Sequence, residues 1–507
     1  MTYSDGDKYT GHWKADHPDG RGMFSFANGD KYVGEWKNGK KEGKGLFTWN
    51  NGDRFEGKFI NDLKEGFGKM IFKNGDKFEG NFKKNIIEGD GKMFYNDKSK
   101  YEGQWKNGLK NGKGIFIFSN GDKYDGNFVD DRMEGKGIYT YKSGGKYNGN
   151  FVNGIKEGKG VMIYPSGNKY DGNFSNDKPN GNGIITFSDG EKYDGEINNE
   201  VIEGKGIFTY KDGDKYEGEF KNGLKDGFGK FIFKNGNIYE GEFKNDKAEG
   251  NGKMIYKNGN EYEGEWKNNE KDGKGIFTYK DGDKYDGEWK NGKSEGNGIF
   301  LFKNGDKYDG NWKNDKMEGN GTFEYMNGDK YIGEYKNGLK EGNGVFIFNT
   351  GEKYEGEFKN NKIEGHGKFY WNNGDIYEGE WKNDLRDGKG IMKYKHGNIY
   401  EGDWKNNKKE GKGILTFKNN DKYDGQWKNN NFQGKGKYIW SNGDSYDGDW
   451  KNDLRDGKGI FNWNDGDKYD GEWKNGVKEG NCIFYDNEEG ISRKQIWKAN
   501  KYVQDVS

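Results

Sequence analysis

The chain has 507 residues, of which 29% are hydrophobic and 34% charged, with a formal net charge of −1. This balance excludes a strong long-range attraction to nucleic acid or to an anionic membrane. The single cysteine, Cys482, excludes an internal disulfide and fits a reducing, intracellular compartment, and no apolar run approaches the about 20 residues of a membrane helix. Low apolar content alone would indicate disorder, but 17% of the residues are aromatic.

Aromatic residues recur every 23 residues from Tyr9 to Tyr469 without a change of register. With each copy numbered from its first aromatic as +0, position +2 is Gly in all 21 copies and position +4 is aromatic in 20. Position +11 is Gly in all 21 copies, position +13 is Gly in 20, and position +17 is aromatic in 20. Such a period predicts one supersecondary unit repeated along the whole chain.

Each copy predicts two short strands joined by tight turns. The segment Tyr285–Trp289 alternates large apolar with charged residues around a central Gly, which is typical of a half-buried strand. Asn291-Gly292 and Asn304-Gly305-Asp306 supply residues that tolerate positive φ in turns. The strand glycines are expected to leave room for an aromatic ring from a neighbouring strand.

The predicted fold class is therefore all-β, an elongated, twisted antiparallel β-meander of about 21 tandem 23-residue β-hairpin repeats, with the solenoid-like character of a single sheet. The repeat array is predicted to span residues 1–490 and a capping segment residues 491–507. Residues 1–8 fit the end of an incomplete repeat, which predicts an open strand edge. The segment from Ile491 is expected to form a last strand or, alternatively, a short helix. Prolines 18, 165 and 179 are expected outside the strands.

Three patterns resemble chemical sites. Gly287–Ser294 matches the Gly-x4-Gly-Lys-Ser phosphate loop, but it is predicted on a hairpin and not before a helix, so no nucleotide or other cofactor is expected. Four histidines, with no cysteine beside them, do not predict a metal site. Carboxylates fill position +10 in 18 copies, and a residue present in nearly every copy is more typical of architecture than of a catalytic site. We therefore predict no catalytic, cofactor or metal residues and no enzyme activity.

Tryptophan is concentrated in the last part of the chain. Because tryptophan is enriched in interface hot spots, a deep aromatic surface there predicts a groove for a partner protein. Core packing of the larger rings is the alternative. The candidate groove residues are Trp371, Trp381, Trp404, Trp427, Trp440, Trp450, Trp463 and Trp473.

The motif Tyr-Glu-Gly-Glu-Trp-Lys-Asn-Gly, with the Gly-x-Gly that follows it, resembles the MORN (membrane occupation and recognition nexus) repeat over residues 1 to about 490. The resemblance implies stacked β-hairpins with a groove, as in junctophilins, radial spoke head proteins and protist cytoskeletal proteins. In relatives that are enzymes, catalysis lies in an appended domain, so the resemblance implies no activity here. The chain departs from the family at +10, where Glu or Asp replaces the frequent His.

We therefore expect a non-enzymatic scaffold that binds partner proteins along its aromatic groove, in the cytoplasm and in a cytoskeletal or ciliary setting. The alternative is a peripheral, phosphoinositide-binding membrane protein, against which the balanced charge speaks. Self-association through terminal edge strands is a third hypothesis, because open edges invite pairing.

Overall fold

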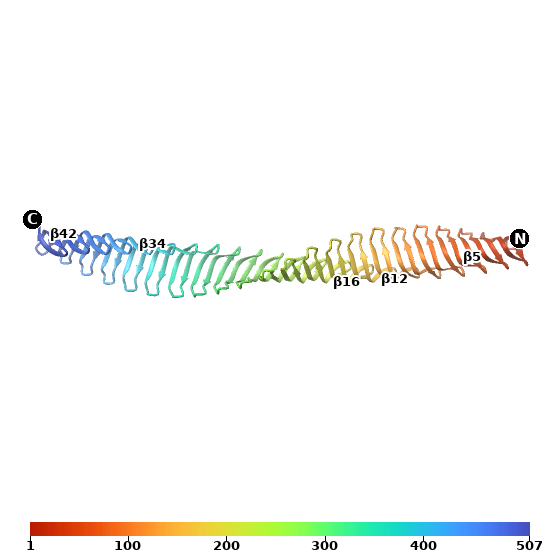
Figure 1. The fold of residues 1–507 in the computed structure, drawn as a ribbon, viewed down its shortest axis with the longest axis horizontal. Helices are drawn as coiled ribbons and strands as arrows, with labels where there is room; N and C mark the ends of the chain where they lie inside the picture. Colours follow the sequence, from red (N-terminus) through yellow and green to blue (C-terminus); the bar gives the residue numbers. More distant parts are fainter. Residues whose placement is uncertain (507) are drawn as a thin grey trace. The chain divides into compact units, whose positions relative to one another are not determined.

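The computed structural model describes residues 1–506, and all regular elements within them are β-strands. The chain divides into two units, unit 1 (residues 1–250) and unit 2 (from residue 251), which are described separately. In each unit the strands are antiparallel and pair in chain order, so each unit is a β-meander (Figure 1). The predicted all-β fold of tandem hairpin repeats is confirmed.

Unit 1 contains the first ten complete hairpins. Their first strands have seven residues and their second strands nine. They are β1 (Lys8–Lys14), β2 (His17–Ser25), β3 (Lys31–Lys37), β4 (Lys40–Thr48), β5 (Arg54–Ile60), β6 (Leu63–Ile71), β7 (Lys77–Lys83), β8 (Ile86–Phe94), β9 (Lys100–Lys106), β10 (Leu109–Ile117), β11 (Lys123–Val129), β12 (Arg132–Thr140), β13 (Lys146–Val152), β14 (Ile155–Ile163), β15 (Lys169–Ser175), β16 (Lys178–Thr186), β17 (Lys192–Asn198), β18 (Val201–Thr209), β19 (Lys215–Lys221) and β20 (Leu224–Ile232). The boundary between the units falls in the next hairpin, β21 (Ile238–Lys244) and β22 (Lys247–Ile255).

Unit 2 continues the same pattern to the end of the described chain. Its strands are β23 (Glu261–Lys267), β24 (Glu270–Thr278), β25 (Lys284–Lys290), β26 (Lys293–Leu301), β27 (Lys307–Lys313), β28 (Lys316–Glu324), β29 (Lys330–Lys336), β30 (Leu339–Ile347), β31 (Lys353–Lys359), β32 (Lys362–Tyr370), β33 (Ile376–Lys382), β34 (Leu385–Lys393), β35 (Ile399–Lys405), β36 (Lys408–Thr416), β37 (Lys422–Lys428), β38 (Asn431–Ile439), β39 (Ser445–Lys451), β40 (Leu454–Asn462), β41 (Lys468–Lys474), β42 (Val477–Asp486), β43 (Ile491–Lys498) and β44 (Lys501–Asp505). The segment after residue 490 thus forms two strands; its role as a cap stays a prediction.

The strand glycines lie opposite one another across the sheet. Within the hairpin of β25 and β26, Tyr285 pairs with Phe300 and Gly287 with Gly298, and a bulge follows Gly287. Gly298 then pairs with Gly310 of the next hairpin. Positions +2 and +13 therefore form a glycine row that crosses the strands and ends at Cys482, which pairs with Gly471.

The turns explain the asparagines and the remaining glycines. The hairpin turn at Asn291 and Gly292 has φ values of 49° and 79°, the left-handed geometry of tight two-residue turns. The connection to the next hairpin closes with a hydrogen bond of 2.9 Å from the Phe302 N–H to the Asp306 carbonyl, and Gly305 there has a φ of 95°. The predicted Asn-Gly and Asn-Gly-Asp turns lie at these two places.

Side-chain carboxylates link each repeat to the next. At position +10, Glu295 accepts a hydrogen bond of 3.1 Å from the backbone N–H of Asn314 in the following repeat. At position +7, Asp315 accepts one of 2.8 Å from the backbone N–H of Ser294 in the preceding repeat. These bonds give the recurring carboxylates a structural purpose.

The expectation that all prolines lie outside strands is wrong. Pro18 and Pro179 are the second residues of β2 and β16. Both occupy position +9. In other repeats the backbone N–H at +9 donates to the side chain at +7 of the next repeat and not to a strand carbonyl, as the Lys41 N–H does to Asp62. Proline therefore removes no bond from the strand ladder there.

Candidate functional site

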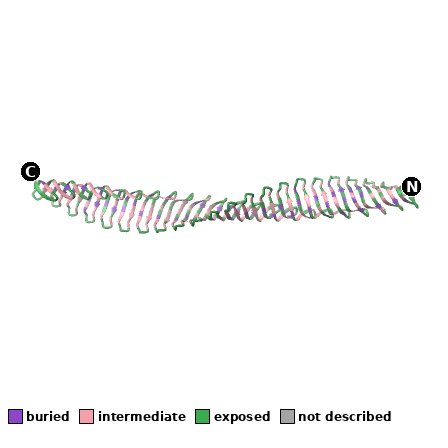
Figure 2. Ribbon diagram, in the orientation of Figure 1, coloured by how far each residue is buried: buried purple, intermediate pink, exposed green. Residues whose placement is uncertain are grey.

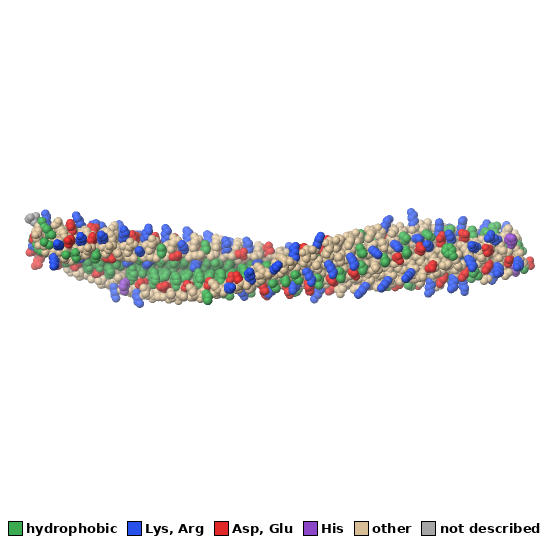
Figure 3. Space-filling view, in the orientation of Figure 1, with side chains coloured by type: hydrophobic (Ala, Val, Ile, Leu, Met, Phe, Trp, Pro, Cys, Tyr) green, Lys and Arg blue, Asp and Glu red, His purple; other side chains and the backbone are tan. Residues whose placement is uncertain are grey.

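One face of each meander carries aromatic and other large apolar side chains in four columns, at positions +0, +4, +15 and +17, and is called the aromatic face below. Tyr400 at +0 is fully buried and Trp404 at +4 is 4% exposed, whereas Phe369 at +15 and Trp371 at +17 are half-buried. Figure 2 shows the buried residues as short segments that recur on successive strands. In unit 2, Figure 3 shows a band of hydrophobic side chains on this face, bordered by charged ones.

The first aromatic of each repeat explains why glycine is required at +2 and +13. A Cβ on Gly287 would lie 2.6 Å from the Tyr285 hydroxyl and 2.6 Å from the Cα of Gly298, and one on Gly298 would lie 2.5 Å from the same hydroxyl. The Tyr285 hydroxyl donates a hydrogen bond of 3.0 Å to the Glu288 carbonyl. The expectation that a neighbouring strand covers the +2 glycine is therefore wrong: the ring comes from the same strand and also covers the +13 glycine opposite.

The rings at +0 and +4 form a ladder of edge-to-face contacts, which is interrupted in unit 1 by Ile197 at +4. Tyr400 meets Trp404 of its own repeat at 5.2 Å between ring centroids and 89° between planes. It meets Trp427 of the next repeat at 5.0 Å and 79°. Edge-to-face pairs at such distances add to the energy of burial alone, so each repeat is stabilised by its neighbours.

The structure divides the predicted tryptophan groove into two sets. The five tryptophans at +4 are at most 7% exposed, and their indole N–H groups donate to a glycine carbonyl of the preceding repeat, as Trp427 does to Gly413 at 2.9 Å. They are part of the core, as the alternative interpretation holds. The tryptophans at +17 are only half-buried and line the open aromatic face: Trp371, Trp440 and Trp463. Partner binding by either set stays a prediction.

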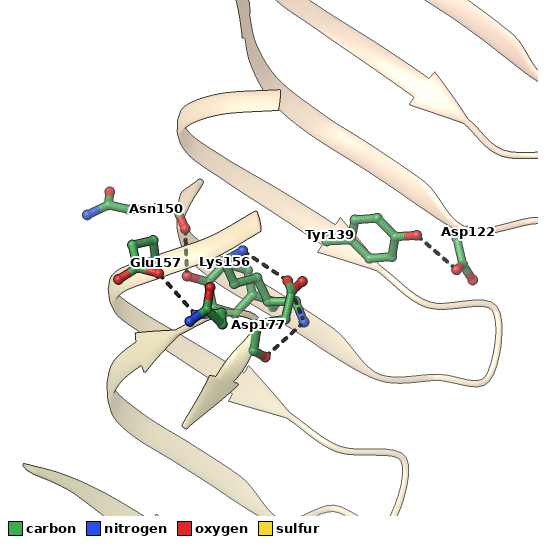
Figure 4. Close-up of polar contacts among 8 residues, drawn as sticks. Asp122, Tyr139, Asn150, Lys156, Glu157 and Asp177 are labelled. Carbon is green, nitrogen blue, oxygen red and sulfur yellow. Dashed lines mark hydrogen bonds and ion pairs between the residues drawn. The ribbon is translucent and has the colours of Figure 1, made fainter. Parts of the chain in front are cut away.

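A column of basic residues at +9 lies among the aromatic rings, and sequence reasoning did not single it out. In unit 1, the Lys156 ammonium lies 3.5 Å from the carboxylate of Asp177, and the Lys156 side chain is only 15% exposed (Figure 4). The same carboxylate accepts a hydrogen bond of 2.9 Å from the Lys156 backbone N–H. The sequence could have revealed this column, because a Lys at +9 is followed 21 residues later by an Asp in the next repeat.

In unit 2 most of the basic side chains at +9 lie over tryptophan rings, whereas Lys340 lies over Phe346 at 4.7 Å. The Lys271 ammonium is 3.7 Å from the centroid of the Trp289 ring, and the Arg455 guanidinium is 4.0 Å from that of Trp473. Such contacts stabilise a cation, but burial still disfavours the charged form. Burial accordingly lowers the pKa to about 8 for three of them: Lys271, Lys409 and Lys478.

The motifs that resemble chemical sites lie in ordinary hairpins. Gly287–Ser294 runs from β25 through a turn into β26, and the Ser294 hydroxyl donates to Asp315 at 3.2 Å. Among residues 1–506 no group of three or more His, Cys, Asp and Glu side chains is arranged to hold a metal ion. The described part of the chain also has no helix long and apolar enough to cross a membrane.

Stacked hairpins, a structural glycine row and one open aromatic face define a β-hairpin repeat protein. A family model for the MORN repeat matches 21 consecutive segments, from residues 9–31 to residues 469–488. The chain therefore belongs to the MORN repeat family, as the sequence predicts. MORN repeats are non-enzymatic and indicate a repeat-based interaction scaffold. A search of curated proteins found no match to this chain.

Similarity to solved structures is weak. The TCP domain of SAS-4 (dCPAP) of Drosophila melanogaster, solved with a proline-rich motif of Ana2 (dSTIL), is 18% identical over 31% of this chain and 85% of that one, with a TM-score of 0.22. The TCP10 domain of Danio rerio CPAP is 11% identical over 48% and 93%, with a TM-score of 0.14. Virginiamycin B lyase from Staphylococcus aureus is 13% identical over 59% and 85%, with a TM-score of 0.10. Scores this low carry no argument about this chain.

Proposed function

We propose that this protein is a non-enzymatic, intracellular scaffold that holds partner proteins along its aromatic face in a cytoskeletal or ciliary assembly. The observation that supports it is the accessible part of that face, where a half-buried aromatic ring at +17 recurs in repeat after repeat, joined at +15 by half-buried rings such as Phe369 and Tyr438. Rigid aromatic side chains supply contact area at a low entropic cost and are enriched in interface hot spots.

The opposite face offers a weaker alternative. Its positions +1, +3 and +12 carry mostly charged side chains, with isolated exposed rings at +12 such as Phe67 and Phe228, which are 61% and 56% exposed. Position +14 is mostly apolar and partly exposed, as at Ile299. Each +14 residue lies between the +1 residues of two neighbouring strands, as Ile299 does between Asp286 and Asp309, so this column does not form a continuous apolar patch and does not by itself mark an interface. The balanced net charge likewise gives little support to a phosphoinositide-binding role.

The proposal is tested by proximity labelling and pull-down in the source cell with a triple variant, Trp371→Ala, Trp440→Ala and Trp463→Ala. These rings are only half-buried, so the hairpins are expected to keep their fold, which circular dichroism checks. The matched control, Phe67→Ala with Phe228→Ala, removes aromatic area from the opposite face. We expect the triple variant to lose the partners that the control keeps. Identical partners for the native chain and both variants would refute binding along the aromatic face.

The cellular setting is tested separately with a fluorescently tagged chain. Its co-sedimentation with the detergent-insoluble fraction, and its position relative to microtubule markers, are the measurements. A chain that stays in the detergent-soluble fraction and is distributed evenly through the cell would refute the proposed cytoskeletal or ciliary location.

A further inference from the structure

The basic column at +9 is neutralised in unit 1. Each of four lysines pairs with the aspartate at +7 of the next repeat, at distances of 3.0 to 3.5 Å, and the lysine side chains are 12 to 16% exposed. Lys64, followed by Asn85, is the exception among the five basic residues in this column of the unit. The four pairs are Lys41–Asp62, Lys110–Asp131, Lys156–Asp177 and Lys225–Asp246.

In unit 2 the basic residues of this column have no such partner. The position that holds aspartate in unit 1, 21 residues on, is Asn or Gly after five of them, and after Lys478 it is taken by Asn500, 22 residues on, which accepts a hydrogen bond from the Lys478 backbone N–H. None of the six forms an ion pair within the described residues of the chain. They are Lys271, Lys340, Arg386, Lys409, Arg455 and Lys478, followed by Gly292, Asn361, Asn407, Asn430, Gly476 and Asn500 respectively.

The hairpin can form with either aspartate or asparagine at +7, so its fold does not require the uncharged residue found there in unit 2. Asn430 accepts a hydrogen bond of 2.8 Å from the Lys409 backbone N–H, just as Asp62 accepts one of 2.9 Å from that of Lys41. Asparagine and aspartate thus accept the same backbone hydrogen bond, and only the charge beside the basic side chain differs. Where unit 2 does have aspartate at +7, the residue at +9 is not basic: Ser294, Ile363 and Phe432 precede Asp315, Asp384 and Asp453.

We propose that the aromatic face of unit 2, from Arg386 to Lys478, binds an acidic, partly apolar segment of a partner protein in an extended conformation. The partner's carboxylates pair with the cations, which have no ion pair among the described residues although Asp453 of the next-but-one hairpin attracts Lys409 from a greater distance, and its apolar side chains pack on the half-buried rings. This inference rests on the proposed scaffold function and specifies which partners the face selects. Charge complementarity identifies the occupant, because an unpaired, half-buried cation gains most from a carboxylate.

Strand spacing sets the pattern of the segment. Two strands per repeat, about 4.8 Å apart, place successive +9 positions about 10 Å from each other. An extended peptide that crosses the strands advances about 3.3 Å per residue, so one acidic residue in three meets the column. Arg386 and Lys409 lie in adjacent repeats, as do Arg455 and Lys478, with Phe432 between the two pairs. The expected segment therefore has two pairs of acidic residues, each pair three apart, separated by an apolar stretch.

The test is a selection of displayed random 16-residue peptides on the full chain. The variant Asn407→Asp with Asn430→Asp places a carboxylate beside Arg386 and Lys409, as in unit 1, and keeps the backbone hydrogen bonds. The control, Asn406→Asp with Asn429→Asp, adds the same charge one residue earlier in the same turns. A second variant, Arg386→Met with Lys409→Met, uses a side chain that the chain itself has at +9 in Met133 and Met317.

We expect the native chain and the control to enrich acidic peptides with apolar residues. We expect both other variants to bind these peptides about tenfold more weakly for each cation neutralised, measured by fluorescence anisotropy. Peptides without an excess of Asp and Glu, or equal binding by all variants, would overturn the inference while leaving the scaffold function standing. No enriched peptide at all would count against the scaffold function as well. A lipid ligand would give a different result: no enriched peptide, but salt-sensitive binding to vesicles of phosphatidylcholine with phosphatidylserine that the Asn→Asp variant loses. That result would show that the cations bind a lipid surface, and it would refute binding of a protein segment.

Discussion

Replacing Gly333 by alanine tests the claim that the tyrosine ring, and not strand flexibility, fixes the glycine row. A Cβ at Gly333 in β29 would lie 2.5 Å from the Tyr331 hydroxyl and 2.6 Å from the Cα of Gly344. The backbone atom on the facing strand cannot yield without opening the hairpin. The ring must therefore leave its place and give up the hydrogen bond of 3.1 Å from its hydroxyl to the Glu334 carbonyl.

The cost follows from these two losses. Overpacking a filled site costs about 1–3 kcal/mol, and the lost hydrogen bond adds about 1 kcal/mol, so Gly333→Ala is expected to destabilise its hairpin by about 2–4 kcal/mol. The control is Gly338→Ala in the turn that follows, where φ is 83° and nothing lies within 4 Å of the added Cβ. Only the left-handed backbone opposes alanine there, at a cost of about 1 kcal/mol.

Hydrogen exchange followed by mass spectrometry is the suitable assay, because a long repeat array does not unfold in one two-state step. Protection of β29 and β30 should fall about 30- to 1000-fold for Gly333→Ala and about fivefold for Gly338→Ala. Strands several repeats away should exchange as in the native chain. Equal losses for the two variants, or unchanged protection in Gly333→Ala, would refute the role given to the Tyr331 ring.

Three further predictions concern the buried polar groups. The Tyr335 hydroxyl is buried without a hydrogen-bond partner among the described residues, so Tyr335→Phe should stabilise its hairpin by about 1 kcal/mol, seen as slower exchange; faster exchange contradicts it. Trp427→Phe, which removes the bond to Gly413, should cost about 1 kcal/mol more than Trp36→Phe, whose indole N–H has no partner in the described chain; equal exchange rates would show that the bond contributes nothing. Folding lowers the lysine pKa to about 8 at three positions, Lys271, Lys409 and Lys478, so the folded state loses these protons more easily than the unfolded state. The thermal midpoint of unit 2 should therefore rise between pH 8 and 9.5, where lysine in the unfolded chain is still charged. The rise should disappear when these three residues are replaced by Met.

The fold was predictable because each column of the repeat has one physical cause. Alternation around Gly287 specifies a strand, and Asn291-Gly292 specifies a two-residue turn, so sequence alone places both strands of the hairpin. The 21 copies repeat this information and leave little room for another assignment. The source of the ring over Gly287 was mispredicted, because periodicity shows which residues share a face but not which way Tyr285 leans along it.

The candidate site was predictable only in part. Alternation places the tryptophans at +4 and +17 on one face, yet it does not show that Trp427 lies beneath the surface while Trp440 remains half-buried. That difference arises from neighbouring repeats, since the ring of Trp427 fits between the tyrosines Tyr400 and Tyr423. A test of partner binding that replaces the +4 tryptophans would therefore disturb the core, and the +17 positions are the appropriate targets.

Position +7 shows how a repeat protein can vary its surface without changing its fold. The hairpin accepts Asp131, Asn407 or Gly292 there, because an oxygen acceptor or a left-handed glycine is all that the turn requires. The charge at this position is then free to differ between repeats. It neutralises Lys110 in unit 1 and leaves Arg386 uncompensated in unit 2. One backbone pattern thus pairs four of the five cations on the aromatic face of unit 1 and, within the described residues, none of the six in unit 2, and on the proposal made above this difference would let a single scaffold distinguish partners by charge while every repeat keeps the same packing.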